Sequence, residues 1–437
     1  MAIRVNRLGL IAAALALASC GGGGYGGGGG YNPPPAAVNN KLAVTVGTPP
    51  AGVNPVGNVL YPDVTICVPG STTQCATVDH VQVDTQSVGL RLMASAINSI
   101  NSAVLTNLKQ ATDGSGHPIF ACITFGDGWS WGALTNVDIH FTSDEKASSV
   151  PVQIIEDPST SNVAPAPASC QNGGPVNNPE NTPADFGANG ILGLGMGLED
   201  CGSACAGSAL PANYYSCTSA NSTGTCTSIT MATGSQIQNP VAALSGSDNN
   251  GIVIAMAATS GATTSLAGTL YFGVGTETNN KLGSARIIPV ETTFDQFIHT
   301  TFQGTDYPMS VIDAGSNGYF FTSNLPLCTG AVAGDTVLYC VGATTALSGV
   351  IQGEAANGSA TGVMITYEFD IDNADAQLAL LLGNPSQPVL PNLAGTLGAQ
   401  TSTFDWGLPL FYGHTVYVVF ANHSASGSAQ TGPYMAL

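Results

Sequence analysis

The sequence predicts an all-β protein with a few short helices, and three observations support this prediction. Short apolar runs recur along the chain and are separated by turns rich in Gly, Pro, Asn and Asp. The chain contains 55 glycines and 26 prolines, which suits many turns between short strands. Hydrophobic residues make up 44% of the 437 residues, so the chain can bury a sizeable core.

Each apolar run is expected to form one strand. The expected strands are Leu42–Val46, Thr77–Val83, Ala121–Phe125, Val137–Phe141, Val152–Ile155, Ile252–Met256, Thr269–Phe272, Val363–Phe369 and Thr415–Phe420. Two stretches have a helix-like pattern instead, Ala94–Leu108 and Phe294–Thr301. Residues 251–276 carry no charged residue, but their many Ser, Thr and Gly residues argue against a membrane helix.

The charge balance excludes one class of partner. Only 8% of the residues are charged, against about 25% in typical soluble domains. Eight basic and 27 acidic residues give a net charge of −19. Because phosphate binding needs a basic face, we expect no nucleic-acid partner.

The first residues have the pattern of a secretory signal. Arg4 and Arg7 precede the apolar run Leu8–Ala18, which is too short to span a bilayer. The run ends in Leu17-Ala18-Ser19-Cys20, which resembles the lipobox of bacterial lipoproteins. The resemblance implies a signal peptide over residues 1–19, cleavage before Cys20 and lipid on this cysteine. Acyl chains would then anchor the protein to the membrane of the bacterial envelope.

Residues 20–41 are expected to form a lipidated tether. Their Gly-rich part is flexible, whereas the following three prolines are stiff, so the tether would hold the folded part off the lipid surface. Gly21 stands where the inner-membrane retention signal has Asp. The resemblance to lipoproteins therefore favours the outer membrane.

The cysteine count indicates an oxidising compartment. Lipid on Cys20 would leave ten of the 11 cysteines, an even number that suits five disulfides. Short loops favour the pairs Cys67–Cys75 and Cys328–Cys340, and Cys122–Cys170 is a further candidate. The spacing within the remaining cluster leaves its pairing open and loosely suggests zinc, but no histidine lies nearby: Cys201, Cys205, Cys217 and Cys226.

One motif occurs in both halves of the chain. Apolar residues precede Asp84-Thr85-Gln86-Ser87, and apolar residues also precede Asp313-Ala314-Gly315-Ser316. Each motif has an Asp, a small residue, a variable position and a Ser. A repeat over so long a distance predicts two related lobes.

These motifs resemble the Asp-Thr/Ser-Gly-Thr/Ser loops of the pepsin-like aspartic peptidases, and further landmarks of that family follow in the same order. The landmarks are a flap-like hairpin at Phe125-Gly126-Asp127-Gly128 with its next strand from Trp131, a threading segment at Asn189–Gly195, an opening strand of the second lobe at Gly268–Gly273 and closing strands from Trp406. The resemblance implies a bilobal fold of two β-barrel-like lobes, residues 42–259 and 260–437, around a central cleft.

The resemblance also implies a mechanism. Asp84 and Asp313 would be the catalytic pair, which shares one proton and activates a water for attack on a peptide bond. The other site residues would support the pair or cover it: Thr85, Ser87, Gly315 and Ser316 in the loops, and Phe125, Gly126, Asp127 and Gly128 in the flap. Such an endopeptidase works best at acidic pH, needs neither cofactor nor metal, and binds peptide in an extended conformation.

Several positions depart from the family pattern and leave a second function open. Gln86 stands where the family has Gly, and Phe125 replaces the flap tyrosine. Arg91 replaces the tryptophan that partners this tyrosine, and a cation there could stabilise ionised Asp84. Ala314 is a milder change. The alternatives to a peptidase are an inactive module that binds peptide or protein in the same cleft and a structural surface lipoprotein.

The chain is also similar to a family of bacterial lipoproteins with a domain of unknown function (DUF3443). This similarity rests on Asn249-Asn250-Gly251 and on the cysteine-rich insert. We expect a monomer. The alternating carboxylates of Asp370–Asp375 suggest either a calcium loop or a solvated turn, and the turn is favoured because the glycine and the distant Glu of a calcium loop are missing.

Overall fold

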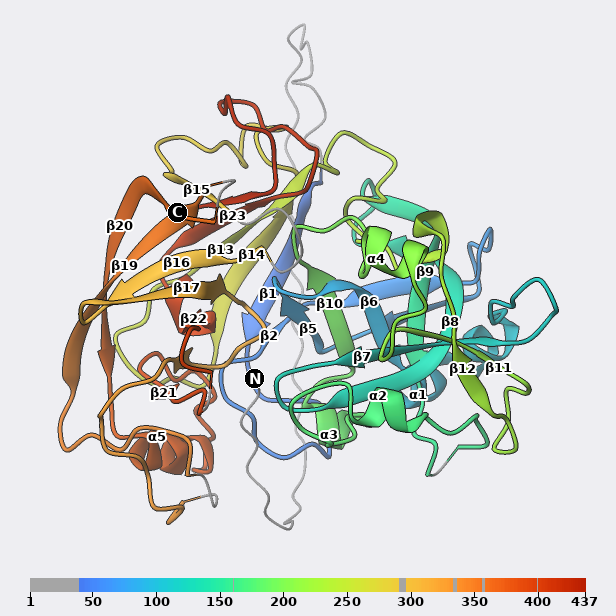
Figure 1. The fold of residues 1–437 in the computed structure, drawn as a ribbon, viewed down its shortest axis with the longest axis horizontal. Helices are drawn as coiled ribbons and strands as arrows, with labels where there is room; N and C mark the ends of the chain where they lie inside the picture. Colours follow the sequence, from blue (N-terminus) through green and yellow to red (C-terminus); the bar gives the residue numbers. More distant parts are fainter. Residues whose placement is uncertain (1–38, 160, 291–295, 333–335, 356–357, 399) are drawn as a thin grey trace, which may run out of the picture.

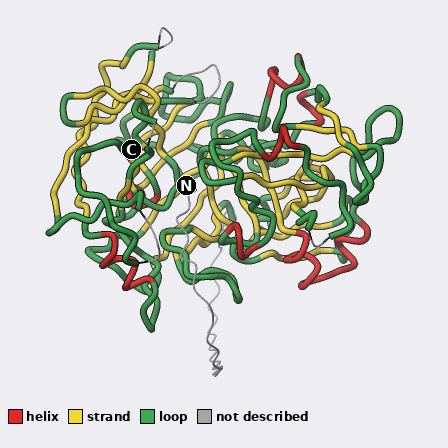
Figure 2. Tube along the Cα trace, turned by 60° about the horizontal axis from the view of Figure 1, so that its bottom comes forward, coloured by secondary structure: helices red, strands yellow, loops and turns green. Residues whose placement is uncertain are grey.

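The computed structural model describes residues 39–437 except residues 160, 291–295, 333–335, 356–357 and 399. Strands dominate it, which confirms the all-β prediction (Figures 1 and 2). The short helices of the described part lie at the edges of the sheets: α1 (Ala94–Asn107), α2 (Ala168–Gln171), α3 (Pro183–Phe186), α4 (Gly202–Gly207), α5 (Ala374–Leu381) and the 3-10 turns η1 (Thr233–Ser235) and η2 (Leu408–Phe411).

The first half of the chain builds a ten-stranded sheet, drawn on the right of Figure 1. Its strands are β3 (Val64–Cys67), β4 (Cys75–Val78), β5 (Val81–Asp84), β6 (Val88–Met93), β7 (Ile119–Thr124), β8 (Trp129–His140), β9 (Lys146–Ile155), β10 (Gly190–Leu194), β11 (Tyr214–Cys217) and β12 (Cys226–Ser228). The order along the sheet is β12-β11-β7-β8-β9-β6-β10-β5, with β3 paired to β8 and β4.

The second half builds a seven-stranded sheet on the left of Figure 1. In spatial order its strands are β20 (Ala360–Ile371), β19 (Thr345–Glu354), β16 (Ile298–Phe302), β17 (Thr305–Ile312), β22 (Asp405–Trp406), β18 (Tyr319–Phe320) and β21 (Ala394–Gly395). Most neighbours are antiparallel, but β22 runs parallel to β17.

A third sheet joins the two halves and lies between them in Figure 1. Its strands, in spatial order, are β15 (Ile287–Pro289), β24 (Tyr434–Ala436), β23 (Thr415–Val419), β13 (Gly251–Met256), β14 (Leu266–Phe272), β1 (Lys41–Val46) and β2 (Leu60–Tyr61). The expected lobe boundary at residues 259–260 falls in the turn between β13 and β14, which pair with each other. This sheet therefore continues across that boundary.

Buried aromatic rings form the core of the second half. Phe404 stacks on Trp406 with 4.2 Å between ring centroids, and Phe321 stacks on Phe404 at 4.8 Å. All three side chains are fully buried. Burying a ring of this size contributes about 2 kcal/mol, so this cluster fixes the strand that carries Phe404 and Trp406.

Two element predictions were wrong. The stretch Phe294–Thr301 is not a helix where it is described, because β16 runs over Ile298–Phe302 and pairs with β17 and β19. Its β-branched residues suit a strand, and the sheet provides partners on both sides. The expected strand Thr77–Val83 is two strands, β4 and β5, because His80 has a φ of 51° and turns the chain.

The disulfide predictions are confirmed. The described cysteines form Cys67–Cys75, Cys122–Cys170 and Cys328–Cys340, and the cluster left open pairs as Cys201–Cys205 and Cys217–Cys226. The cluster is thus a pair of disulfides, since its sulfurs are bonded to each other and cannot act as zinc thiolates.

The N-terminal predictions fall on residues outside the described part. These are the signal peptide, lipid on Cys20 and most of the tether over residues 20–41. Among the residues that the structure does describe, no helix has the length and apolar character needed to cross a membrane.

Candidate functional site

The two Asp motifs lie at the ends of strands that share one local topology. Asp84 ends β5, and Asp313 directly follows β17. In the first half β10 lies between β5 and β6 and runs parallel to β5. In the second half β22 lies between β17 and β18 and runs parallel to β17. Each Asp loop therefore passes around the end of an inserted parallel strand.

The first loop holds its carboxylate with backbone N–H groups. The amides of Gln86 and Ser87 donate to Oδ1 of Asp84 at 2.7 and 3.1 Å. The resemblance implies that the Ser87 hydroxyl also bonds this carboxyl group. Instead, Ser87 Oγ is buried and has no hydrogen-bond partner in the described structure. That expected contact is therefore absent, because the chain brings the serine amide and not its hydroxyl to the carboxylate.

The second loop holds its carboxyl group from both sides. The amide of Gly315 donates to Oδ1 of Asp313 at 2.7 Å, and the hydroxyl of Ser316 lies 2.9 Å from Oδ2. The Ser316 hydroxyl also lies 2.6 Å from Oδ2 of Asp405, a residue of β22. Three polar side chains are thus linked in the second loop, whereas the first loop uses backbone donors.

Side chains of the first loop also reach across to the second. The Thr85 hydroxyl donates to the carbonyl of Ile312 at 2.9 Å and accepts from the amide of Ala314 at 3.0 Å. The Thr85 hydroxyl thus connects the two Asp loops. The Gln82 side chain donates to the carbonyl of Gly315 at 2.8 Å. Since Gln82 and Thr85 are buried, these bonds hold the two Asp loops together in a dry environment.

Both carboxyl groups face one cavity of about 210 Å³. It is lined by Gln82, Asp84, Gln86, Ser87, Ile123, Thr124, Phe125, Gly126, Asp127, Glu180, Phe186, Ile191, Asp313 and Gly315. A Cβ atom placed on Gly315 would lie 3.0 Å from Oδ1 of Asp84 and 3.1 Å from Oδ1 of Asp313. The absence of a side chain at Gly315 therefore leaves room beside both carboxyl groups, although no direct hydrogen bond joins them among the described residues.

The electrostatics differ between the two carboxyl groups. Burial raises the pKa of Asp313 well above its ordinary value, and the nearby charges of Asp84 and Asp405 raise it further. Asp313 therefore keeps its proton to a higher pH than an ordinary Asp does. The backbone donors on Asp84 suit an ionised carboxylate.

A hairpin between β7 and β8 covers the cavity. The amide of Phe125 donates to the carbonyl of Gly128, and the Phe125 ring packs edge-on against Phe186. Residues 177–180 lie beside this hairpin and are hydrogen-bonded to it, because the Trp129 amide donates to the Asn178 carbonyl at 2.9 Å. The sequence predicted the hairpin but not this neighbouring segment, which pairs through a single isolated bridge and has no strand pattern.

Gln86 separates this cavity from a second one of about 590 Å³. The two cavities share Gln86, Ser87, Ile123 and Thr124 in their walls. The Gln86 amide group points across to the second loop, with Nε2 at 3.5 Å from the carbonyl of Ile312. It therefore lies beside the carboxyl pair, at the boundary between the two cavities.

Arg91 does not serve the carboxyl pair. Its guanidinium is 1% exposed and donates to Asp200 at 2.9 Å and to Gln153 at 2.8 Å. The Tyr214 hydroxyl donates to the other oxygen of Asp200 at 2.5 Å. The expected stabilisation of ionised Asp84 by this cation is therefore replaced by a buried ion pair with Asp200 behind the loop.

Asp405 is a polar residue of the site that sequence reasoning missed. Its side chain is 6% exposed, and burial raises its pKa to about 6, with a further increase from the charge of Asp84. The register gives the available signal. Asp405 pairs with Val311 as Ile191 pairs with Gln82 in the first half. An acidic residue at the position where the first half has the apolar Ile191 therefore distinguishes Asp405.

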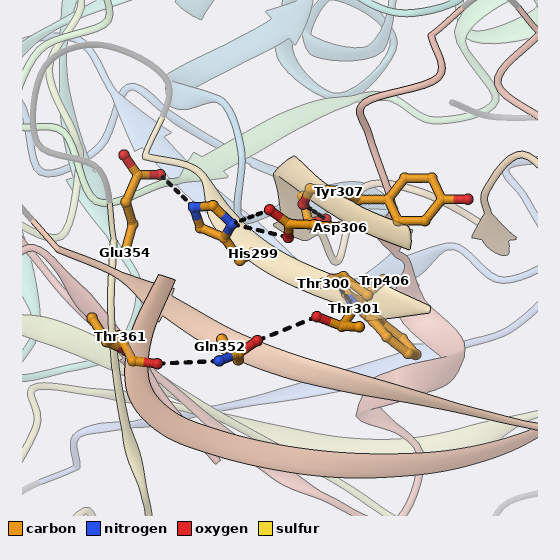
Figure 3. Close-up of polar contacts among 10 residues, drawn as sticks. His299, Thr300, Thr301, Asp306, Tyr307, Gln352, Glu354, Thr361 and Trp406 are labelled. Atoms are coloured by element: carbon orange, nitrogen blue, oxygen red, sulfur yellow. Dashed lines mark hydrogen bonds and ion pairs between the residues drawn. The ribbon is translucent and has the colours of Figure 1, made fainter. Parts of the chain in front are cut away.

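Two other clusters lie away from the carboxyl pair. In Figure 3 His299 lies between Asp306, at 3.0 Å from Nδ1, and Glu354, at 3.9 Å from Nε2. Among the described residues, one group of three potential metal ligands comes together, Cys328, Cys340 and Asp375. These cysteines form a disulfide and offer no thiolate.

The turn at Asp370–Asp375 uses its polar groups internally. Asp372 accepts from Thr344 and Asn392, and Asn373 caps the first turn of α5 by accepting from the Ala376 amide. These contacts agree with the turn that the sequence favoured.

The comparisons with known proteins name a family. No curated protein matches the chain. The model of one family, described as "Protein of unknown function (DUF3443)", matches residues 36–437. This match covers all of the described residues, including both Asp loops and the hairpin. The chain therefore belongs to the DUF3443 family.

Proposed function

We propose that this chain is an aspartic endopeptidase with a bilobal, pepsin-like fold. The observation that carries the proposal is the pair of equivalent loops that bring Asp84 and Asp313 to one cavity beneath a hairpin. Two carboxyl groups at one site share a proton, and the chemistry of peptide hydrolysis needs one ionised and one protonated group.

In the proposed mechanism Asp84 is the general base and Asp313 the general acid. Asp84 takes a proton from a water molecule, whose oxygen attacks the carbonyl carbon of the peptide. Asp313 gives its proton to the carbonyl oxygen, which forms a tetrahedral diol. Collapse of the diol breaks the C–N bond as the leaving nitrogen receives the proton that Asp84 took from the water. One hydroxyl group of the diol gives its proton to Asp313, which restores the starting state of the pair. The backbone donors of Gln86 and Ser87 hold the Asp84 carboxylate in place for the first step.

The substrate would be a peptide in an extended conformation. The cavity beneath the hairpin and the second cavity beyond Gln86 are neighbours that share wall residues, and an extended peptide would lie along both. An extended chain presents alternate side chains to such a path. The motif at Cys20 supports a lipid anchor in the bacterial envelope, with the outer membrane favoured by Gly21.

A binding module without turnover is the second candidate, and Gln86 favours it. Its side chain stands beside the carboxyl pair and contacts the opposite loop, so it narrows the path that a peptide must follow. The hairpin also has Phe125 and thus lacks a hydroxyl group that could orient a water or a substrate.

Cleavage of a diverse peptide mixture at pH 3 to 8 separates the two candidates. The peptidase predicts products at acidic pH that disappear in Asp84→Asn and in Asp313→Asn, with folding intact by circular dichroism. Peptides that bind without being cut would establish the binding module and overturn the peptidase.

A test of the anchor uses the full-length chain in a bacterial host with labelled palmitate. Incorporation that is lost in Cys20→Ala supports the lipid anchor. Equal labelling of both proteins, or no labelling, contradicts it. Fractionation of the two membranes of the envelope then shows which one holds the lipoprotein.

A further inference from the structure

Asp405 is placed at the site by its strand. β22 is only two residues long, but it lies between β17 and β18 and is hydrogen-bonded to both. The indole N–H of the next residue, Trp406, donates to the Thr300 hydroxyl of β16 at 2.9 Å, and the two residues lie together in Figure 3. Because Trp406 is fully buried, this contact fixes the position and direction of the Asp405 side chain.

The Ser316 hydroxyl connects Asp405 to Asp313. Its oxygen lies 2.6 Å from Oδ2 of Asp405 and 2.9 Å from Oδ2 of Asp313. A hydroxyl group carries a single proton, so it donates to one of these carboxyl groups only. The other contact is a hydrogen bond only when that carboxyl group carries a proton and donates to the serine oxygen. The geometry therefore requires a proton on Asp313 or on Asp405.

The surroundings of Asp405 favour a carboxyl group that is not permanently charged. Its side chain is 6% exposed, and Oδ1 is buried with no hydrogen-bond partner among the described residues. A carboxylate in this position would leave a charged oxygen without any donor, which is costly in a dry interior.

The other titratable groups near β22 have their own partners. On β17 Asp306 is bonded to His299, and the Tyr307 hydroxyl donates to the Thr322 carbonyl. On β18 Tyr319 is hydrogen-bonded to Tyr367. The charged groups that act on Asp405 are therefore those of the carboxyl pair, Asp84 directly and Asp313 through Ser316.

We propose that Asp405 is a positioning residue of the carboxyl pair and exchanges a proton with Asp313 through the Ser316 hydroxyl. In this exchange the proton of Asp405 Oδ2 moves to Ser316 Oγ while the Ser316 proton moves to Asp313 Oδ2. No proton is gained or lost by the three groups together. The counterpart in the first half is Ile191, so the exchange is confined to the second loop.

The exchange has a consequence for catalysis that rests on the proposed peptidase function. A negative charge on Asp405 helps Asp313 to keep its proton, so the general acid stays protonated at a pH where an ordinary Asp is ionised. After Asp313 has given its proton to the substrate, the negative charge on Asp405 favours the return of a proton to Asp313.

The test compares pH profiles of peptide cleavage for a set of matched variants. Asp405→Asn keeps the shape and offers an amide donor to Ser316, but it has neither charge nor exchangeable acid proton. We expect the alkaline limb of its profile to move to lower pH by about one unit. Ser316→Ala should move the limb in the same direction, whereas Ser316→Thr keeps the hydroxyl and should restore the wild-type limb. Asp63→Asn, at an exposed position, is the control for loss of a carboxylate and should not move it.

An unchanged alkaline limb in folded Asp405→Asn overturns the proposal, even when the rate falls, because a purely structural residue changes rate and not titration. If Asp405→Asn does not fold, the Ser316→Ala and Ser316→Thr pair decides by the same criterion.

A measurement without turnover separates this inference from the proposed function. Carbon NMR of the protein labelled at the Asp carboxyl carbons follows each titration, and the Asn variants assign the signals of Asp84, Asp313 and Asp405. If the wild type cuts no peptide but the Asp313 signal titrates at lower pH in Asp405→Asn, the peptidase proposal fails and the proton exchange stands. If the Asp313 titration is the same in both proteins, the exchange is wrong.

Discussion

The two Asp loops have the same place in their sheets but different neighbours. In the first loop a strand with Ile191 lies beside the Asp, the carboxylate is held by backbone N–H groups, and a glutamine stands next to the cavity. In the second loop the inserted strand carries Asp405, a hydroxyl group bonds the carboxyl, and Gly315 leaves the space open.

The two carboxyl groups therefore lie in different surroundings. The first loop holds its carboxyl group with backbone N–H groups and lies beneath the hairpin that covers the cavity. The second loop contributes only Asp313 and Gly315 to the cavity wall but holds the buried proton. The repeat therefore specifies where the carboxyl groups lie, and the residues around each one specify its charge.

The largest expected effect concerns the hairpin between β7 and β8, which covers the cavity and belongs to the first half. Cys122 lies on β7, the strand that leads into the hairpin, and pairs with Cys170 over 48 residues. Replacing both by Ala should lower the free energy of unfolding by about 4 kcal/mol, because the unfolded chain loses a large loop constraint. Urea unfolding measures it. The matched control removes Cys201–Cys205, which spans 4 residues, and should cost about 2 kcal/mol. Equal losses would contradict this account.

Substitutions at Gly315 and at the matching Gln86 test the open space that Gly315 leaves beside the two carboxyl groups. In Gly315→Ala the new Cβ would lie 2.8 Å from Cγ of Asp84, which is too close, so the carboxyl pair must move apart. We expect peptide cleavage to fall by about 100-fold, since displacements near 1 Å have effects of this size. Gln86→Ala, at the matching position, keeps its Cβ and should retain cleavage. A Gly315→Ala protein as active as the wild type would show that the pair does not act together.

The two serines should differ in their contribution to stability. Ser316→Ala removes a hydroxyl that links two buried carboxyl groups and should cost about 2 kcal/mol in the free energy of unfolding. Ser87→Ala removes a buried hydroxyl without a partner and should be neutral within about 0.5 kcal/mol. Denaturant unfolding of both variants provides the comparison. A larger loss for Ser87→Ala would mean that its hydroxyl has a partner.

The last effect is the pH dependence that the second loop imposes. The pKa of Asp405 is about 6 when folded and 3.8 ordinarily, so the folded state holds this proton longer than the unfolded chain. Stability therefore falls as pH rises from about 4 to about 6, by at most about 3 kcal/mol. Glu145, whose pKa is raised to about 7 by burial and by Asp248, extends the fall to higher pH.

Asp405→Asn should flatten the part of this curve below pH 6 and leave the part due to Glu145. Thermal unfolding measured between pH 4 and pH 8 checks both parts. A curve that keeps its full slope in the variant would show that Asp405 is ionised over the whole range.

The sequence was informative where the pattern is local. Short apolar runs between turns predicted β1, β7, β13 and β23 to within a few residues, because buried strands need apolar side chains and end at turn residues. The two Asp loops were found for a similar reason, since a carboxyl group at the end of an apolar strand stands out. Loop length alone predicted Cys67–Cys75.

Features that depend on partners distant in the chain were missed. β16 looked helical because one of its two neighbours, β19, comes much later in the sequence. The sequence did not single out Asp405, because its contact with Ser316 spans 89 positions. The orphaned hydroxyl of Ser87 depends on how closely Gly193 packs against it, which no pattern shows.

The most direct test of the central claim is the cleavage of a peptide mixture by the folded protein from residue 39 onward, at acidic pH. Asp84→Asn and Asp313→Asn, run beside it, provide the decisive comparison. We expect that the wild type cuts peptides and that each single variant does not, because each loop supplies one half of the same acid–base pair. Cleavage that survives either substitution, or a folded wild type that cuts nothing, would contradict it.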